Sequence, residues 1–113
     1  MFKRFFSKDI NIPTLRLTGV IGQAGIARSG LTIAGIEKLV EKLFADKKSP
    51  AVALIINSPG GSPTQSSLIA EKIINLAKEK NKKVFAFVED VAASGGYWLA
   101  CAADEIYLDL NSI

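Results

Sequence analysis

The chain has 113 residues, a net charge of +3 and a hydrophobic share of 49%, which fits one folded domain and excludes a disordered chain or a strongly basic nucleic-acid-binding surface. It contains no histidine and a single cysteine, so these residues cannot form a Ser-His-Asp or Cys-His catalytic group or an internal disulfide. With no histidine and no cysteine cluster we expect no metal site, and nothing in the sequence predicts a cofactor. Cys101 lies between two alanines and is expected to be a buried structural thiol.

Residues 1–12 are predicted to be a basic, aromatic tail that precedes a single α/β core at 13–113. The tail lacks the apolar stretch and small-residue cleavage site of a secretory signal, and no apolar run in the chain approaches the ~18–20 residues of a membrane span. We favour docking of the tail on the domain or on a partner chain, with association with an anionic membrane surface as the alternative. The expected location is therefore the cytoplasm or the inner face of the membrane.

Two hydrophobic patterns alternate along the chain in the order strand, helix, strand, helix, strand, helix, strand. Apolar runs predict strands at Thr14–Ile21, Ala51–Ile56, Lys83–Val88 and Glu105–Leu108. Apolar residues at helical spacing predict helices at Leu31–Ala45, Thr64–Lys80 and Gly95–Ala103. The last helix is almost wholly apolar and is expected to be buried. The order predicts an α/β fold with parallel pairing, and the continuous apolar runs predict a sheet covered on both faces.

Two further segments have no clear pattern. Residues Gly22–Gly30 are glycine-rich without periodicity and predict an irregular loop, either mobile or ordered only against substrate or a neighbouring chain. The sequence stops soon after the fourth strand, so we expect the sheet to be incomplete towards the C-terminus.

A glycine-rich turn, Asn57–Pro63, follows an apolar strand and opens the next helix. Ser62 is a good helix N-cap, Gln65 follows at the spacing of a capping box, and a proline occupies the first helical position. Gly60 and Gly61 allow close backbone approach, and their N–H groups could supply the two donors of an oxyanion hole. A plain strand-to-helix turn explains the same residues. A phosphate-binding loop fits less well, because its lysine and hydroxyl residue are missing.

A second loop, Ala92–Tyr97, joins the next apolar strand to a helix and contains Ser94. Open α/β sheets place their sites at this edge, and the N-terminus of the following helix favours a developing negative charge. The pattern is not the G-x-S-x-G elbow of α/β-hydrolases, because Ala92 replaces the first glycine. The alternative is that Ser94 serves only as an N-cap.

The two loops are more informative together than separately. They follow successive strands that we expect to be adjacent, and adjacent strands lie ~4.8 Å apart. The Ser94 oxygen and the N–H groups of Gly60 and Gly61 are therefore predicted to converge on one substrate carbonyl.

Both motifs resemble those of one peptidase family. The pair Ile56-Asn57-Ser58-Pro59-Gly60-Gly61 and Val91-Ala92-Ala93-Ser94-Gly95-Gly96-Tyr97 resembles the signal peptide peptidase A family of serine peptidases, and is more distantly similar to the proteolytic subunit of Clp protease and to crotonases. The resemblance implies a crotonase-like (Clp protease-like) α/β fold of stacked ββα units, with a mostly parallel sheet flanked by helices. It also implies that Ser94 is the nucleophile. Gly60, Gly61 and Gly95 are the expected backbone contacts of the oxyanion or substrate, and Ser58 and Tyr97 are candidates for a substrate pocket.

The family pairs its serine with a lysine as general base, which agrees with the missing histidine. That lysine lies several dozen residues beyond the serine, whereas this sequence ends at Ile113. We therefore expect the base to lie outside these residues and the fragment alone to be inactive. The lysines that are present nearby are expected in solvated positions: Lys72, Lys78, Lys80, Lys82 and Lys83.

The function expected of the intact protein is that of a serine endopeptidase acting on remnant signal peptides or membrane-protein segments. Expected partners are a peptide or protein substrate and further copies of the chain, without nucleic acid. One alternative is a non-catalytic assembly module, and a second is a crotonase-type acyl-thioester enzyme that lacks a nucleophile. Tyr97 and Trp98 are expected in the core or at a subunit contact, and Glu89 and Asp90 as solvated or salt-bridged surface groups.

Overall fold

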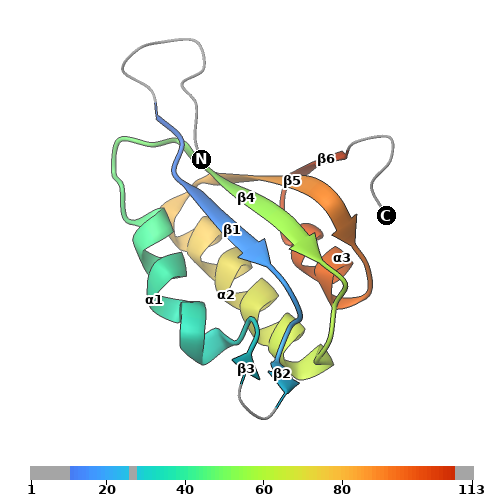
Figure 1. Cartoon of the computed structure of the whole chain (residues 1–113). Coiled ribbons are helices and arrows are strands. Elements are labelled where there is room, and N and C mark those ends of the chain that lie inside the picture. The colour runs from blue at the N-terminus through green and yellow to red at the C-terminus, as the bar shows by residue number, and fades with distance from the viewer. Residues whose placement is uncertain (1–10, 26–27, 109–113) are drawn as a thin grey trace.

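The computed structural model describes residues 11–25 and 28–108, so residues 1–10 of the predicted tail lie outside the described part. Four parallel strands form one sheet in the order β1-β4-β5-β6 (Figure 1). Their bounds are Thr14–Thr18, Ala51–Ser58, Lys83–Ala92 and Glu105–Leu108. The helices α1, α2 and α3 span Ile33–Phe44, Pro63–Lys80 and Gly95–Ala100. The predicted α/β order and parallel pairing are confirmed.

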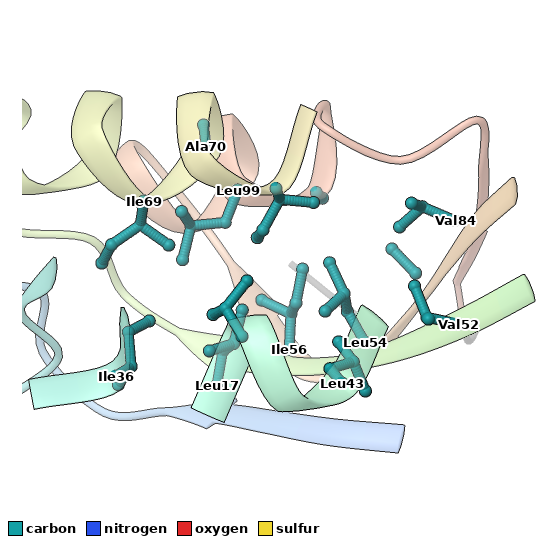
Figure 2. Close-up of a cluster of buried hydrophobic side chains, with 14 of the residues drawn as sticks. Leu17, Ile36, Leu43, Val52, Leu54, Ile56, Ile69, Ala70, Val84 and Leu99 are labelled. Carbon is teal, nitrogen blue, oxygen red and sulfur yellow. The ribbon is translucent and has the colours of Figure 1, made fainter. Parts of the chain in front are cut away.

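The core lies between the sheet and the helices, which share one side of it (Figure 1). Successive strand residues point to opposite faces, so Val52, Leu54 and Ile56 of β4 enter the core together. Figure 2 shows them facing side chains that come from the helices, among them Ile69 of α2 and Leu99 of α3.

The other face of the sheet differs from the expectation. Among the described residues no helix covers it, so the prediction of a sheet covered on both faces is not met there (Figure 1). Ile55, Phe87 and Tyr107 align across this face in the strand register. The rings of Phe87 and Tyr107 stack with centroids 5.2 Å apart, and both side chains are exposed. Continuous apolar runs gave the wrong expectation because they show that both faces are apolar, not that both are covered.

The N-termini of the two long helices are linked. Ser62 caps α2 as predicted, accepting a hydrogen bond from the Gln65 N–H at 3.1 Å. The Gln65 side chain does not complete a capping box. Its Oε1 instead accepts from the N–H of Ile33 at the start of α1, at 2.8 Å, while the Ser62 N–H donates to the Ile21 carbonyl. The prediction of Ser62 as the N-cap is confirmed, whereas the partner of the Gln65 side chain depends on how α1 and α2 pack.

The segment predicted as an irregular loop contains a small hairpin. Strands β2 (Gln23–Gly25) and β3 (Arg28–Ser29) pair antiparallel, and residues 26 and 27 are outside the described part. Strand β1 ends earlier than predicted, because the chain turns at Gly19, where φ is +100°. Ile21 then forms isolated parallel bridges to Leu31 and to Gly61. Strands this short leave no detectable periodicity in the sequence.

Two predictions about α3 are wrong. The helix ends at Ala100 and buries only one side, while Tyr97 and Trp98 are 60% and 45% exposed. Cys101 is also exposed, so the predicted buried thiol is not found. A six-residue helix on the rim of a single core can bury only one stripe of its surface, here Gly95, Gly96, Leu99 and Ala100.

Within residues 11–25 and 28–108, none of the helices combines the length and apolar character that crossing a membrane requires.

Adjacent residues of α2 provide a test of this packing. Ile69 is fully buried, whereas Leu68 is exposed. We expect Ile69→Ala to lower the free energy of unfolding by about 2–5 kcal/mol, because it leaves a cavity. Leu68→Ala should change it by about 0.5 kcal/mol or less. Urea denaturation measures both, and similar losses in the two variants would contradict the described orientation of α2.

Candidate active site

The two motif loops meet because their strands are neighbours. Strand β4 pairs with β5 from Ala51↔Lys83 to Ile56↔Val88, and after a register shift Ser58 pairs with Ala92. The Ala93 N–H then donates to the Ser58 carbonyl at 3.2 Å. The expectation that these loops follow adjacent parallel strands is confirmed, and both emerge at the carboxyl edge of the sheet.

Gly60 lies directly against the serine loop. A Cβ atom at this position would be 2.8 Å from the Ser94 Cβ and 2.8 Å from the Gly95 nitrogen. Its φ of +102° is also one that L side chains rarely adopt. Only glycine satisfies both requirements, and the contact brings the glycine turn next to Ser94.

Ser94 has an unusual backbone conformation for a residue with a side chain, with φ 52° and ψ −117°. Such a conformation costs of order 1–3 kcal/mol and persists only where the surroundings enforce it. The side chain is exposed, and although Ser94 stands at the N-cap position of α3, its hydroxyl makes no capping hydrogen bond. The Ser94 carbonyl accepts from the Trp98 N–H at 3.1 Å. The local backbone therefore presents the hydroxyl at the surface instead of using it as a cap.

The backbone donors around Ser94 are not equivalent. The Gly60 N–H donates to the Ser58 hydroxyl at 3.1 Å. In the described part of the chain the N–H groups of Gly61 and Gly95 make no hydrogen bond. The Gly60 carbonyl accepts from Ile21 at 2.9 Å, on the β1 side of β4. In a trans peptide unit the N–H points opposite to the carbonyl, so the Gly61 N–H points towards the β5 side, where Ser94 lies.

The two predicted pocket residues lie in different surroundings. Ser58 is fully buried at the end of β4, so its side chain does not line a surface pocket in this structure. Tyr97 is exposed on α3, three residues from Ser94. The side chain of Tyr97 is therefore accessible, while that of Ser58 lies beneath the two loops.

Sequence reasoning missed Asn57, whose side chain joins the two strands just before the loops. Its Oδ1 accepts from the Val91 N–H at 3.3 Å, and its Nδ2 lies 3.5 Å from Asp90 Oδ2. Glu89 forms an ion pair with Arg16 at 2.8 Å, as expected for a salt-bridged surface group. An asparagine at a strand end is a weak signal, because the sequence does not reveal which backbone group it will meet.

Among the described residues no side chain is hydrogen-bonded to the Ser94 hydroxyl. Lys72 pairs with Glu41 at 2.8 Å and Glu37 at 3.7 Å, between α1 and α2. The hydrogen bond to Glu41 raises the pKa of Lys72, which is opposite to the change that a general base at neutral pH needs. The Lys82 ammonium donates to the Asp46 carbonyl. The described residues also contain no group of three or more acidic or cysteine side chains that could hold a metal ion.

The sequence comparisons agree with the motifs. Residues 76–113, which include Ser94, match peptidase family S49. The chloroplastic serine protease SPPA of Arabidopsis thaliana is 38% identical, over 82% of this chain and 16% of that protein. The chain is thus similar to peptidase family S49 and to the SPPA serine protease. A Brucella melitensis protein named as the Na(+)/H(+) antiporter NhaA is 54% identical, over 98% of this chain and 15% of that protein. The chain spans less than a fifth of the length of each of these two relatives.

The structural comparison supports the same fold. The ClpP1 N165D mutant from Listeria monocytogenes matches with a TM-score of 0.59 at 23% identity, over 80% of this chain and 46% of that one. At this identity the match shows the fold alone. The predicted crotonase-like, Clp protease-like α/β architecture is confirmed.

Alanine variants of two glycines with positive φ test the cost of backbone strain separately from the cost of a steric contact. Gly19 has φ +100° and open space around the Cβ position, whereas a Cβ on Gly61 would lie 2.1 Å from the Ile21 carbonyl oxygen. Gly19→Ala should lower the free energy of unfolding by about 1–2 kcal/mol. Gly61→Ala should cost about 1–3 kcal/mol more, because a backbone group must move. Equal losses in urea denaturation would show that the Ile21–Gly61 contact is looser than described.

Gly95 provides a second test, because the atom that would meet its Cβ can be removed. A Cβ on Gly95 would lie 2.2 Å from the Oγ of Ser66, a buried residue of α2. We expect Gly95→Ala and Ser66→Ala each to destabilise the fold. In the double variant the loss should be smaller than the sum of the two by about 0.5–3 kcal/mol. Strict additivity in a double-mutant cycle would contradict this contact.

Proposed function

We propose that the protein containing these residues is a serine endopeptidase and that Ser94 attacks the substrate carbonyl. The observation that carries the proposal is the conformation of Ser94, which exposes an uncapped hydroxyl beside two N–H groups without partners. Strained residues of this kind are concentrated at active sites. Similarity to peptidase family S49 supports the same reaction class.

The proposed reaction begins with transfer of the Ser94 proton to a base and attack of its oxygen on the peptide carbonyl. The N–H groups of Gly61 and Gly95 would donate to the carbonyl oxygen as it becomes negative. The leaving amine takes a proton, and water then releases the acyl group from Ser94. Gly60 belongs to the same turn, but its N–H is already bonded to Ser58, so its part is to allow the close contact with the serine loop.

We propose that the base is a lysine supplied from outside the 113 residues. Among the lysines that the structure describes, Lys72 is ion-paired with glutamates and Lys82 is bound to a backbone carbonyl, which supports this assignment. The isolated chain should therefore be poorly reactive, because a serine without a base is a weak nucleophile.

The proposed substrates are extended, apolar peptides such as remnant signal peptides or membrane-protein segments. The proposed partner is a second copy of the chain, because β6, which lies at the edge of the sheet as far as the structure describes it, exposes Ile106, Tyr107 and Leu108. Peripheral attachment at a membrane, through residues 1–10, stays a prediction that falls outside the described part of the chain.

Labelling with a fluorophosphonate probe tests the role of Ser94. The protein is purified at its natural length, its intact mass is measured, and the adduct is located by peptide mapping. We expect one adduct, on Ser94, and its complete loss in Ser94→Ala together with peptide hydrolysis. Ser67→Ala, on α2, is the matched control and should keep both the adduct on Ser94 and peptide hydrolysis.

Three outcomes would count against the proposal. Hydrolysis that persists in Ser94→Ala would exclude this serine as the nucleophile. Absence of any adduct in a folded protein of natural length would favour the non-catalytic assembly module. A thermal shift with coenzyme A derivatives would instead favour an acyl-thioester enzyme.

A further inference from the structure

Ser58 is a buried polar residue that the proposed reaction does not use. Its side chain is fully buried, and its hydroxyl accepts the Gly60 N–H at 3.1 Å. Its carbonyl accepts the Ala93 N–H at 3.2 Å. A Cβ on Gly96 would lie 2.4 Å from that same carbonyl oxygen. One residue therefore contacts the glycine turn, the serine loop and the start of α3.

The hydrogen bond to Ser58 determines the orientation of one of the two peptide units that flank Gly60. The unit before Gly60 is held through its N–H by the Ser58 hydroxyl. The unit after Gly60 is held through its carbonyl by the Ile21 N–H at 2.9 Å. Glycine has the widest range of backbone angles, and these two hydrogen bonds restrict Gly60, whose φ is +102°. The second unit also carries the Gly61 N–H, which points to the Ser94 side.

We propose that Ser58 is a positioning residue. Its hydroxyl engages the Gly60 N–H and thereby fixes the turn so that the N–H of Gly61, not that of Gly60, is presented beside Ser94 together with that of Gly95. The inference rests on the proposed peptidase function for its catalytic consequence, but its structural part concerns only the hydrogen bond and the turn. Burial makes the bond durable, because breaking it would leave the Gly60 N–H buried without a partner, which is unfavourable.

A matched control lies next to the other end of the same strand. Ser49 is buried just before β4, and its hydroxyl lies 3.4 Å from the Ala51 nitrogen, the same i to i+2 relation as Ser58 and Gly60. Its hydroxyl also donates to the Ala51 carbonyl at 2.5 Å. Replacing either serine by alanine removes one buried hydroxyl from an end of β4, but only Ser58 lies at the end that carries the loops.

The first measurement is amide hydrogen exchange by NMR on Ser58→Ala and Ser49→Ala, and it does not require an active enzyme. In Ser58→Ala we expect exchange of the Gly60 N–H to accelerate at least 10-fold and the Gly61 resonance to shift, while most other amides of α2 and β4 keep their protection. In Ser49→Ala both glycine amides should be unchanged. Unaltered Gly60 exchange in a folded Ser58→Ala would overturn the proposal.

The second measurement is the rate of fluorophosphonate labelling and of peptide hydrolysis in the protein of natural length. Loss of one aligned oxyanion donor lowers kcat by about 100–1,000-fold, and partial misalignment should cost part of that. We expect Ser58→Ala to lower kcat about 10–100-fold with KM nearly unchanged, and Ser49→Ala to lower neither. Ser58→Cys, with a weaker acceptor of similar shape, should fall between Ser58→Ala and the wild type.

The outcomes separate the two proposals. If the wild type is neither labelled nor active but the Gly60 amide responds to Ser58→Ala, the peptidase function fails and the positioning of the turn stands. If the wild type is active and Ser58→Ala keeps full kcat, the positioning role is wrong. If Ser58→Ala does not fold, amide exchange and kcat are measured in Ser58→Cys instead. Wild-type values of Gly60 exchange and of kcat in Ser58→Cys would reject the proposal.

Discussion

The close contact between the glycine turn after β4 and the serine loop after β5 is the constraint on which the site depends. It is possible only because Gly60 has no Cβ, since any side chain there would overlap with the Ser94 Cβ and the Gly95 nitrogen. Parallel pairing of β4 with β5 brings the two loops to the same edge of the sheet, and the hydrogen bond from the Ala93 N–H to the Ser58 carbonyl fixes one loop relative to the other. The position of Ser94 beside the glycine turn is therefore a consequence of strand pairing and of the absence of one carbon atom.

The backbone of Ser94 is strained, and packing of the neighbouring core holds it in that conformation. Ser94 has positive φ without being glycine, which costs of order 1–3 kcal/mol. Below it, α3 packs Leu99 and Ala100 into the main cluster, and Gly95 lies against Ser66 of α2. These contacts leave little room for the loop to relax, and so keep the serine hydroxyl out of the capping geometry that it would otherwise prefer.

The hairpin and the turn at Gly19 also contribute to the site, although they carry none of its proposed chemistry. After Gly19 the chain leaves the edge of the sheet and Ile21 pairs with the glycine turn, through its N–H to Gly60 and its carbonyl to Ser62. A residue from the first strand region thus holds the loop that follows β4. The opposite face of the sheet has no such support among the described residues, and the stacked Phe87 and Tyr107 remain exposed on it.

The sequence by itself determined the features that depend on local chemistry. Strand β6 matches its predicted range, Ser62 is an N-cap, and the two motifs end adjacent parallel strands. Periodicity, caps and turn residues are encoded within a few positions of one another. The tertiary structure alone decided that Tyr97, Trp98 and Cys101 are exposed, because the side of a short helix that is covered depends on what packs against it. It also decided that the N–H of Gly60 is occupied and that of Gly61 is not. The Ser58 hydroxyl occupies the Gly60 N–H. The direction of the Gly61 N–H depends on the bond between the Gly60 carbonyl and Ile21, about forty residues earlier in the chain, and no local pattern reveals that pairing.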